Sequence, residues 1–218
     1  MTVAEIDWAA IEIRELIDPQ DPALPALLDI YQKSFPLEEQ MLVSFFLQLL
    51  AGKGRGESEE YHLEVLASDA VVGGFAMYEI GEEVPGVGRP AYLWYVAAHA
   101  DVRGQSLGKR LYHHVVNTVF TQYGCAGLFF EIEQTGDVMA RHGKDAADFA
   151  AWRRQWYCRQ GARQLRGVSY LCSVDWQPAV PMDVMVHPAD TMTAEAALIL
   201  ARAIQSESIE ATGELELI

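Results

Sequence analysis

The segment from Ala91 to Val116 constrains the fold of this chain more than any other stretch. It begins with an apolar, aromatic-rich run, Tyr92 to Ala98, whose composition is typical of a β-strand and which a turn-prone tripeptide follows. Apolar residues then recur every four positions from Leu107 onward, which predicts a helix that begins near Gly104 to Ser106. The sequence therefore predicts a strand, a short glycine-containing loop and a helix in succession.

The loop has the properties of an anion-binding site. A helix start carries backbone N–H groups without intrahelical partners and the positive end of the helix dipole, and small residues let an anion approach the main chain. The run Arg103 to Gly108, RGQSLG, meets this requirement, and Lys109 and Arg110 add basic side chains. An ordinary strand-to-helix turn capped by Ser106 also needs only small residues, so it stays as the alternative.

This run resembles the acetyl-CoA-binding signature Q/R-x-x-G-x-G/A of the GNAT superfamily of acetyl-CoA-dependent N-acetyltransferases. Arg103 matches the first position and Gly108 the last, and Ser106 stands where the family usually has glycine. We expect the Ser106 hydroxyl to donate one more hydrogen bond to the phosphates. The resemblance implies that CoA is bound by a loop and by strand backbone, namely by Arg103, Gly104, Gln105, Ser106, Leu107, Gly108 and Lys109, and by Val96, Ala97 and Ala98.

The remaining patterns predict the other elements. Before the central strand, they indicate a strand, two helices and a hairpin: 11–17, 24–35, 38–50, and 61–68 with 71–80. After the central helix, they indicate a strand, a loop, a helix, two strands and a last amphipathic helix: 126–132, 134–144, 146–160, 165–174, 182–186 and 193–208. The acidic tail from Glu207 onward is expected to fray.

Without the last helix, this order resembles that of the GNAT fold. We therefore predict an α/β fold of the α+β type, with a mixed central sheet of about seven strands flanked by helices. Residues 1–188 would form the acyl-CoA-binding domain, and residues 189–218 a C-terminal helical extension that packs on the domain or on a partner. The strand at 182–186 is expected to be an outer strand with one solvated face, and with the last helix it offers a candidate homodimer face.

Composition excludes several classes of function. The formal net charge of −15 argues against a nucleic-acid partner and favours a cationic substrate. No apolar run is long enough to span a membrane, and the acidic N-terminus lacks the layout of a signal peptide. The three cysteines form no C-x-x-C pair, so reduced thiols and a cytoplasmic location are expected.

Acetyl transfer to an amine requires a base for the amine and an acid for the departing thiolate. The segment Trp156 to Ala162 resembles the family's F-Y-x-x-x-G-F pattern, and Tyr157 falls on the tyrosine that faces the CoA sulfur. The resemblance therefore implies that Tyr157 is the acid. The alternative is a helix tyrosine that packs on the sheet.

Two pairs of acidic residues are candidates on the acceptor side. Glu131 and Glu133 alternate with apolar residues on a buried strand, where a carboxylate is costly unless it is paired or lines a cleft, so either one is a candidate base. They could also lie solvated at the strand's end. The resemblance places Glu38 and Glu39 in a wall of the acceptor site, although helix N-termini also favour acidic residues.

No histidine spacing matches a metal site, and His113 and His114 are expected to form a surface pair on the helix. We therefore predict a metal-independent acetyltransferase that moves an acetyl or acyl group from acetyl-CoA to an amine of a small molecule or peptide. The alternative function is a GNAT-fold module that binds acyl-CoA or another protein without turnover.

Overall fold

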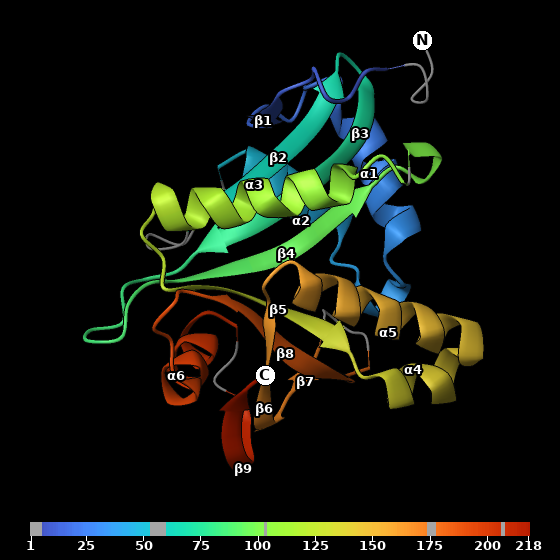
Figure 1. The fold of residues 1–218 in the computed structure, drawn as a ribbon. Coiled ribbons are helices and arrows are strands. Elements are labelled where there is room, and N and C mark those ends of the chain that lie inside the picture. Colours follow the sequence, from blue (N-terminus) through green and yellow to red (C-terminus); the bar gives the residue numbers. More distant parts are fainter. Residues whose placement is uncertain (1–5, 53–59, 103, 174–177, 206–207) are drawn as a thin grey trace. The chain divides into compact units, whose positions relative to one another are not determined.

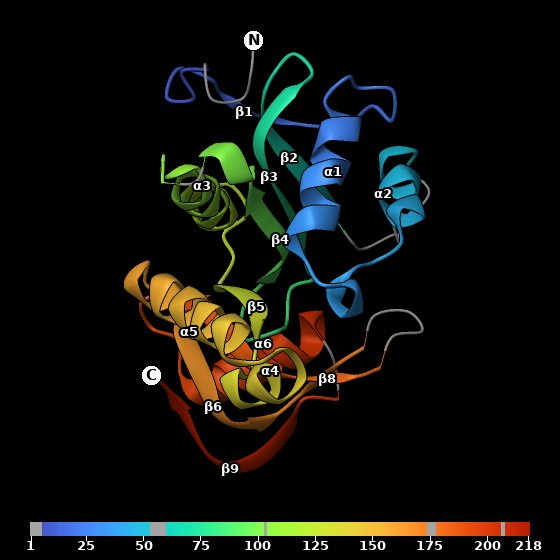
Figure 2. The same ribbon diagram turned by 90° about the vertical axis from the view of Figure 1, so that its right-hand side faces the viewer.

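The computed structural model describes residues 6–52, 60–102, 104–173, 178–205 and 208–218. The chain divides into two compact units, shown in Figures 1 and 2. The first unit comprises residues 1–80 and 93–118, and the second comprises residues 81–92 and 119–218. Strand β4 (Pro90–Ala98) and helix α3 (Leu107–Thr121) contribute residues to both units.

The first unit is a sheet with strand order β1-β2-β3-β4. β1 (Ile13–Glu15) and β3 (Val71–Ile80) both pair antiparallel with β2 (Glu60–Ser68). Helices α1 (Leu24–Ser34) and α2 (Val43–Leu50) cover one face of this sheet and α3 covers the other (Figure 2).

Successive side chains of β2 point to opposite faces of the sheet, and this explains why the first unit has one apolar cluster on each face. Leu63 and Val65 point into the cluster that contains the apolar residues of α1 and α2. Leu66 belongs instead to the cluster formed with Leu107 and Leu111 of α3. Each face of the sheet is therefore buried by its own helices.

The approach of α3 to the sheet depends on a glycine. A Cβ atom on Gly74 of β3 would lie 2.6 Å from the carbonyl oxygen of Ala97 and 2.8 Å from Cδ1 of Leu111. Both distances are shorter than real Cβ contacts, so any other residue would push β4 and α3 away from β3.

The second unit is a sheet with strand order β4-β5-β8-β6-β9, in which β5 (Gly127–Glu133) runs parallel to β4 over Pro90–Tyr92. The other strand pairs are antiparallel and are formed by β6 (Arg163–Ser169), β7 (Leu171–Cys172), β8 (Val180–Pro188) and β9 (Glu210–Leu217). The predicted mixed sheet flanked by helices is confirmed, with nine strands among the described residues.

Helices α4 (Thr135–His142), α5 (Lys144–Arg159) and α6 (Ala194–Ile204) belong to the second unit. Phe130 of β5 contacts Tyr157 of α5, with ring centroids 4.7 Å apart. The next residue, Glu131, contacts Gln205 at the end of α6. Successive residues of a strand point to opposite faces, so α5 and α6 cover opposite faces of β5.

The prediction of a loop between residues 134 and 144 is wrong, because this segment contains α4. The helix buries Val138 against Ala147 and Ala150 of α5, and it ends at Gly143, whose φ of 82° only glycine adopts readily. Because α4 has one buried residue among the polar ones, its sequence lacks the apolar stripe that normally predicts a helix.

Two other predictions for the second unit are also wrong. β8 is an inner strand between β5 and β6, and its Asp183 is paired with Arg154 of α5. The polar residue that indicated a solvated face is therefore an ion-pair partner. The tail is not frayed either, since residues 210–217 form β9, which pairs with β6. Val174, at the end of the predicted strand 165–174, lies outside the described residues.

Candidate active site

The predicted anion-binding loop leads into the N-terminus of α3. The hydrogen bond from the backbone N–H of Arg110 to the carbonyl oxygen of Ser106, 2.9 Å, is the first of the helical series. The N–H groups of Leu107, Gly108 and Lys109 precede this bond, and in helical geometry they have no intrahelical acceptor. Gly104 to Ser106 are exposed, and Arg103 lies outside the described residues.

Ser106 has a φ of 61°, in the left-handed region that glycine adopts without steric cost. This conformation explains why glycine suits this position of the signature, and Ser106 adopts it in this chain although it carries a side chain. The hydroxymethyl group is accommodated at an exposed position, with strain in the backbone.

We expect Ser106→Gly to raise the free energy of unfolding by up to about 1 kcal/mol, because relief of left-handed strain exceeds the entropy cost of glycine. Denaturant unfolding checks this. Ser106→Ala is the matched control, since it removes the hydroxyl but keeps the strained φ. A Ser106→Gly protein less stable than Ser106→Ala would contradict the strain argument.

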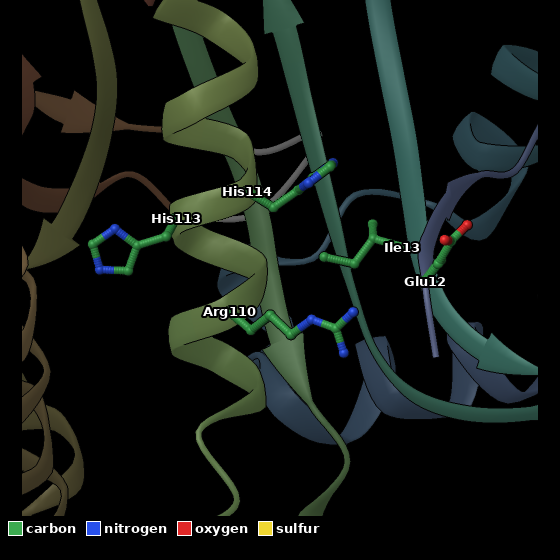
Figure 3. Close-up of a pocket in the computed structure, with 5 residues that line it drawn as sticks. All are labelled: Glu12, Ile13, Arg110, His113 and His114. Atoms are coloured by element: carbon green, nitrogen blue, oxygen red, sulfur yellow. The ribbon is translucent and has the colours of Figure 1, made fainter. Parts of the chain in front are cut away.

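Arg110 has a structural role in the first unit. Its guanidinium donates hydrogen bonds to the carbonyl oxygens of Trp8 and Ile11 and so anchors the segment before β1. Figure 3 shows Arg110 and His114 pointing from α3 toward this segment and lining a hollow with Glu12 and Ile13. The uncharged carbonyl groups of Trp8 and Ile11 fix the guanidinium in place and leave its positive charge uncompensated by them.

His114 is half-buried and has a partner in the first unit, so it fits the predicted surface pair only in part. Its Nε2 lies 3.2 Å from the carboxylate of Glu64, which is only 8% exposed and also accepts a hydrogen bond of 3.0 Å from the Tyr78 hydroxyl. The hydrogen bond with Glu64 raises the pKa of His114. His113 is exposed, as predicted, and it also lines this hollow.

The strand residues predicted to bind CoA through their backbone, Val96, Ala97 and Ala98, end β4. Val96 and Ala98 pack in the cluster on the α3 face, and Ala97 packs in the cluster on the α1 and α2 face. Their side chains are thus part of the core of the first unit, which leaves any role in CoA binding to their backbone groups.

The sequence predicted that Glu38 and Glu39 begin the second helix, and this prediction is wrong. They lie in a short 3-10 helix, η2 (Leu37–Glu39), and α2 starts only at Val43. The hydroxyl of Tyr95 donates to the Glu39 carbonyl at 2.9 Å and accepts from the Met41 N–H at 3.3 Å. These bonds hold the segment between η2 and α2 in a non-helical conformation.

Glu131 is the centre of a polar cluster in the second unit. Its Oε2 accepts hydrogen bonds from the Tyr92 hydroxyl and, at 2.9 Å, from Nε2 of Gln205. The thiol of Cys172 lies 3.5 Å from its Oε1. Burial raises the pKa of Glu131, and the hydrogen bonds from Tyr92, Cys172 and Gln205 oppose this rise. The carboxyl therefore titrates above its usual range.

Glu133, the last residue of β5, has a different environment from that of Glu131. It is 7% exposed and forms an ion pair with Arg153 of α5. Arg154 of the same helix pairs with Asp183 of β8. Glu133 therefore fastens α5 to the sheet, and of the two candidate bases Glu131 is the one held by neutral donors.

Tyr157 lies on α5, partly buried, with its ring against Phe130 and Trp156. Burial raises the pKa of its phenol to about 12; Arg153 lowers the pKa and Glu133 raises it. The phenol is therefore protonated throughout the physiological range and acts as a donor. Its ring packs against β5, and this packing leaves the hydroxyl's predicted role as an acid open.

Sequence reasoning missed the residues that surround Glu131. Tyr92 was assigned only to an apolar strand, and Cys172 and Gln205 to a strand and a helix of the C-terminal part. A hydroxyl within a buried strand is the one signal that could have indicated Tyr92, because such groups need a partner. In the described part of the chain, no group of three metal-ligating side chains occurs, and no helix is long and apolar enough to cross a membrane.

The chain matches the model of the acetyltransferase (GNAT) family over residues 24–142, and it belongs to this family. A comparison with curated protein sequences finds no match. Solved structures with a similar fold include Arabidopsis thaliana NAA60 in complex with acetyl-CoA, at 17% identity and a TM-score of 0.57, covering 83% of this chain and 99% of that one.

Two bacterial structures are also similar. One is a ribosomal-protein-alanine N-acetyltransferase from Brucella melitensis, at 20% identity and a TM-score of 0.53, covering 82% of this chain and all of the other, 100%. The second, from Desulfovibrio desulfuricans, is described as an acetyltransferase of the GNAT family, at 20% identity and a TM-score of 0.54, covering 82% of this chain and 99% of that one. These likenesses confirm the predicted fold.

Proposed function

We propose that the protein transfers an acetyl group from acetyl-CoA to an amine of a peptide or small molecule by direct attack in a ternary complex. The observation that carries this proposal is the environment of Glu131. Its carboxylate is oriented by two hydrogen bonds to one oxygen, and burial raises its pKa toward the range useful for a general base. Family membership supports acetyl transfer as the reaction.

In the proposed reaction, Glu131 takes a proton from the amine, and the amine nitrogen forms a bond to the thioester carbonyl carbon. The carbon–sulfur bond then breaks, and the thiolate receives a hydrogen bond or proton from the phenol of Tyr157. Phe130 and Glu131 point to opposite faces of β5, so the base and the tyrosine that contacts Phe130 come from opposite faces of this strand.

The first unit would supply the binding groups. We propose that the pyrophosphate of CoA binds the N–H groups of Leu107, Gly108 and Lys109, because a helix N-terminus favours anions. Glu38 and Glu39 would form part of the acceptor site. Together with the net charge of −15, they favour a cationic acceptor. Among proteins with a similar fold, one is named for the acetylation of an alanine of a ribosomal protein, which supports peptide amines as candidates.

Thiol release from acetyl-CoA, measured across amines, polyamines, amino acids and peptides, tests this function. We expect turnover with at least one acceptor, and a decrease of kcat of roughly 100-fold in Tyr157→Phe, because the phenylalanine keeps the ring but cannot donate to the thiolate. Trp156→Phe is the matched control, since it alters the neighbouring ring without removing the phenol. CoA binding without turnover on any acceptor would contradict the proposal and favour an acyl-CoA-binding or protein-interaction module.

A further inference from the structure

The C-terminal part of the chain contributes a side chain to Glu131. Gln205 follows α6 and lies 74 positions after Glu131, and its Nε2 is 2.9 Å from the carboxylate oxygen Oε2. The family model matches residues 24–142, so this contact comes from outside the matched region. The last helix is therefore more than a cover for its sheet.

The chemistry of the cluster determines how the Gln205 amide is oriented. A carboxylate only accepts hydrogen bonds, so the NH₂ group of Gln205 and not its carbonyl must face it. The Tyr92 hydroxyl donates to the same oxygen. Oε1 faces the thiol of Cys172, a weak donor, at 3.5 Å. The two strong donors thus hold one oxygen, and the other is left to exchange a proton.

Gln205 is placed by a well-anchored segment. The Thr193 hydroxyl caps α6 by accepting from the N–H of Ala196 at 3.2 Å, and the N–H of Gln205 donates to the Ala201 carbonyl at 2.8 Å. A Cβ atom on Gly81 would lie 2.5 Å from Cδ1 of Ile204, so α6 ends in close contact with the start of the loop before β4. This packing fixes the position of the amide.

The contacts of Gln205 favour a role in orientation over one in stability. Its Oε1 is buried and has no hydrogen-bond partner among the described residues. A buried acceptor without a partner weakens a fold, so the amide is a poor choice for packing alone. The amide instead serves its polar partners, namely the carboxylate of Glu131 and the nearby phenol of Tyr170.

We propose that Gln205 is a positioning residue that orients the Glu131 carboxylate for proton transfer, which makes the C-terminal segment part of the catalytic apparatus. This inference rests on the proposed function. Glu131 touches the reacting amine in that function, whereas Gln205 acts through Glu131.

The test compares Gln205→Leu with the wild type, and Gln122→Leu, an exposed position, is the matched control. NMR of the Glu131 carboxyl carbon, recorded without acetyl-CoA, measures the titration midpoint of this group. In Gln205→Leu we expect the midpoint to rise by about one pH unit, because the carboxylate loses a donor. The acid limb of kcat/KM should move by the same amount, which corresponds to about a tenfold loss at low pH. Activity at high pH, where Glu131 is ionised in both proteins, should also be lower than in the wild type, because the carboxylate is no longer held in orientation.

A second variant keeps the test independent of the packing of leucine. Gln205→Glu preserves size and polarity but places a second carboxylate beside Glu131, so the titration should move upward further. An unchanged Glu131 titration in both variants overturns the proposal. A shifted titration with an unshifted acid limb overturns the positioning role. A wild type without turnover on any acceptor overturns the proposed function itself, and the titration still reports the contact.

Discussion

Replacement of Glu131 with glutamine is expected to lower kcat about 100- to 10,000-fold, the range typical for loss of a general base. Glutamine keeps the size of the side chain and can still accept the hydrogen bond of Tyr92, so the fold should persist. Thiol release at saturating acetyl-CoA, with the acceptor that the wild type uses best, measures the loss. Thermal unfolding verifies that the variant is folded.

The pH dependence of the wild type belongs to the same prediction. The base acts in its ionised form, and burial raises the pKa of Glu131, so kcat/KM should fall on acidification at a pH above the ordinary range of glutamate, near 4.3. Glu131→Gln should lack this acid limb. A folded Glu131→Gln protein with wild-type kcat would show that another group takes the proton.

Glu133→Gln serves as the companion variant. It removes the partner of Arg153 and leaves the guanidinium beside a neutral amide, so stability should decrease more than activity. A large loss of kcat in this variant at unchanged stability would transfer the role of base to Glu133.

Replacement of Gly108 with glutamate is expected to weaken CoA binding by at least about 100-fold, because like charges brought together cost several kcal/mol. The structure allows this test to be specific. A Cβ atom on Gly108 meets no atom within 4 Å, so side chains at this position do not disturb the core. Calorimetric titration with CoA measures the effect.

Gly108→Ala is the control for the loop. It adds the Cβ atom without charge, and in the first turn of α3 it should keep CoA affinity and slightly raise stability. Unchanged CoA affinity in Gly108→Glu would refute the assignment of the pyrophosphate to the start of α3.

The sequence predicted best those elements whose signals are local. The strand, turn and helix around Ser106 are encoded within a short segment, and the structure begins α3 at Leu107 as that segment indicates. The environment of Glu131 was not predictable in the same way. Its partners Tyr92 and Gln205 lie 39 and 74 positions away, and no local periodicity reports such a contact.

Pairing between distant segments also explains the errors in the fold. Asp183 gave β8 the pattern of a solvated strand, but Arg154 neutralises its charge inside the unit. The tail resembles a disordered acidic segment, yet it packs closely on β6. A Cβ atom on Gly167 of β6 would lie 2.2 Å from the carbonyl oxygen of Glu214, so only glycine allows this approach. A chain with few apolar residues became a strand because a partner edge was available.

The hydroxyl of Tyr95 binds the main chain of Glu39 and Met41, and the hydroxyl of Tyr31 donates to the Met41 carbonyl at 3.0 Å. Both tyrosines recognise backbone atoms, which every amino acid provides. Substitutions at positions 38 and 39 would therefore leave this attachment in place. If Glu38 and Glu39 line the acceptor site as proposed, a lineage of such proteins could change its acceptor by mutation at these two positions, while the scaffold that presents them is inherited unchanged.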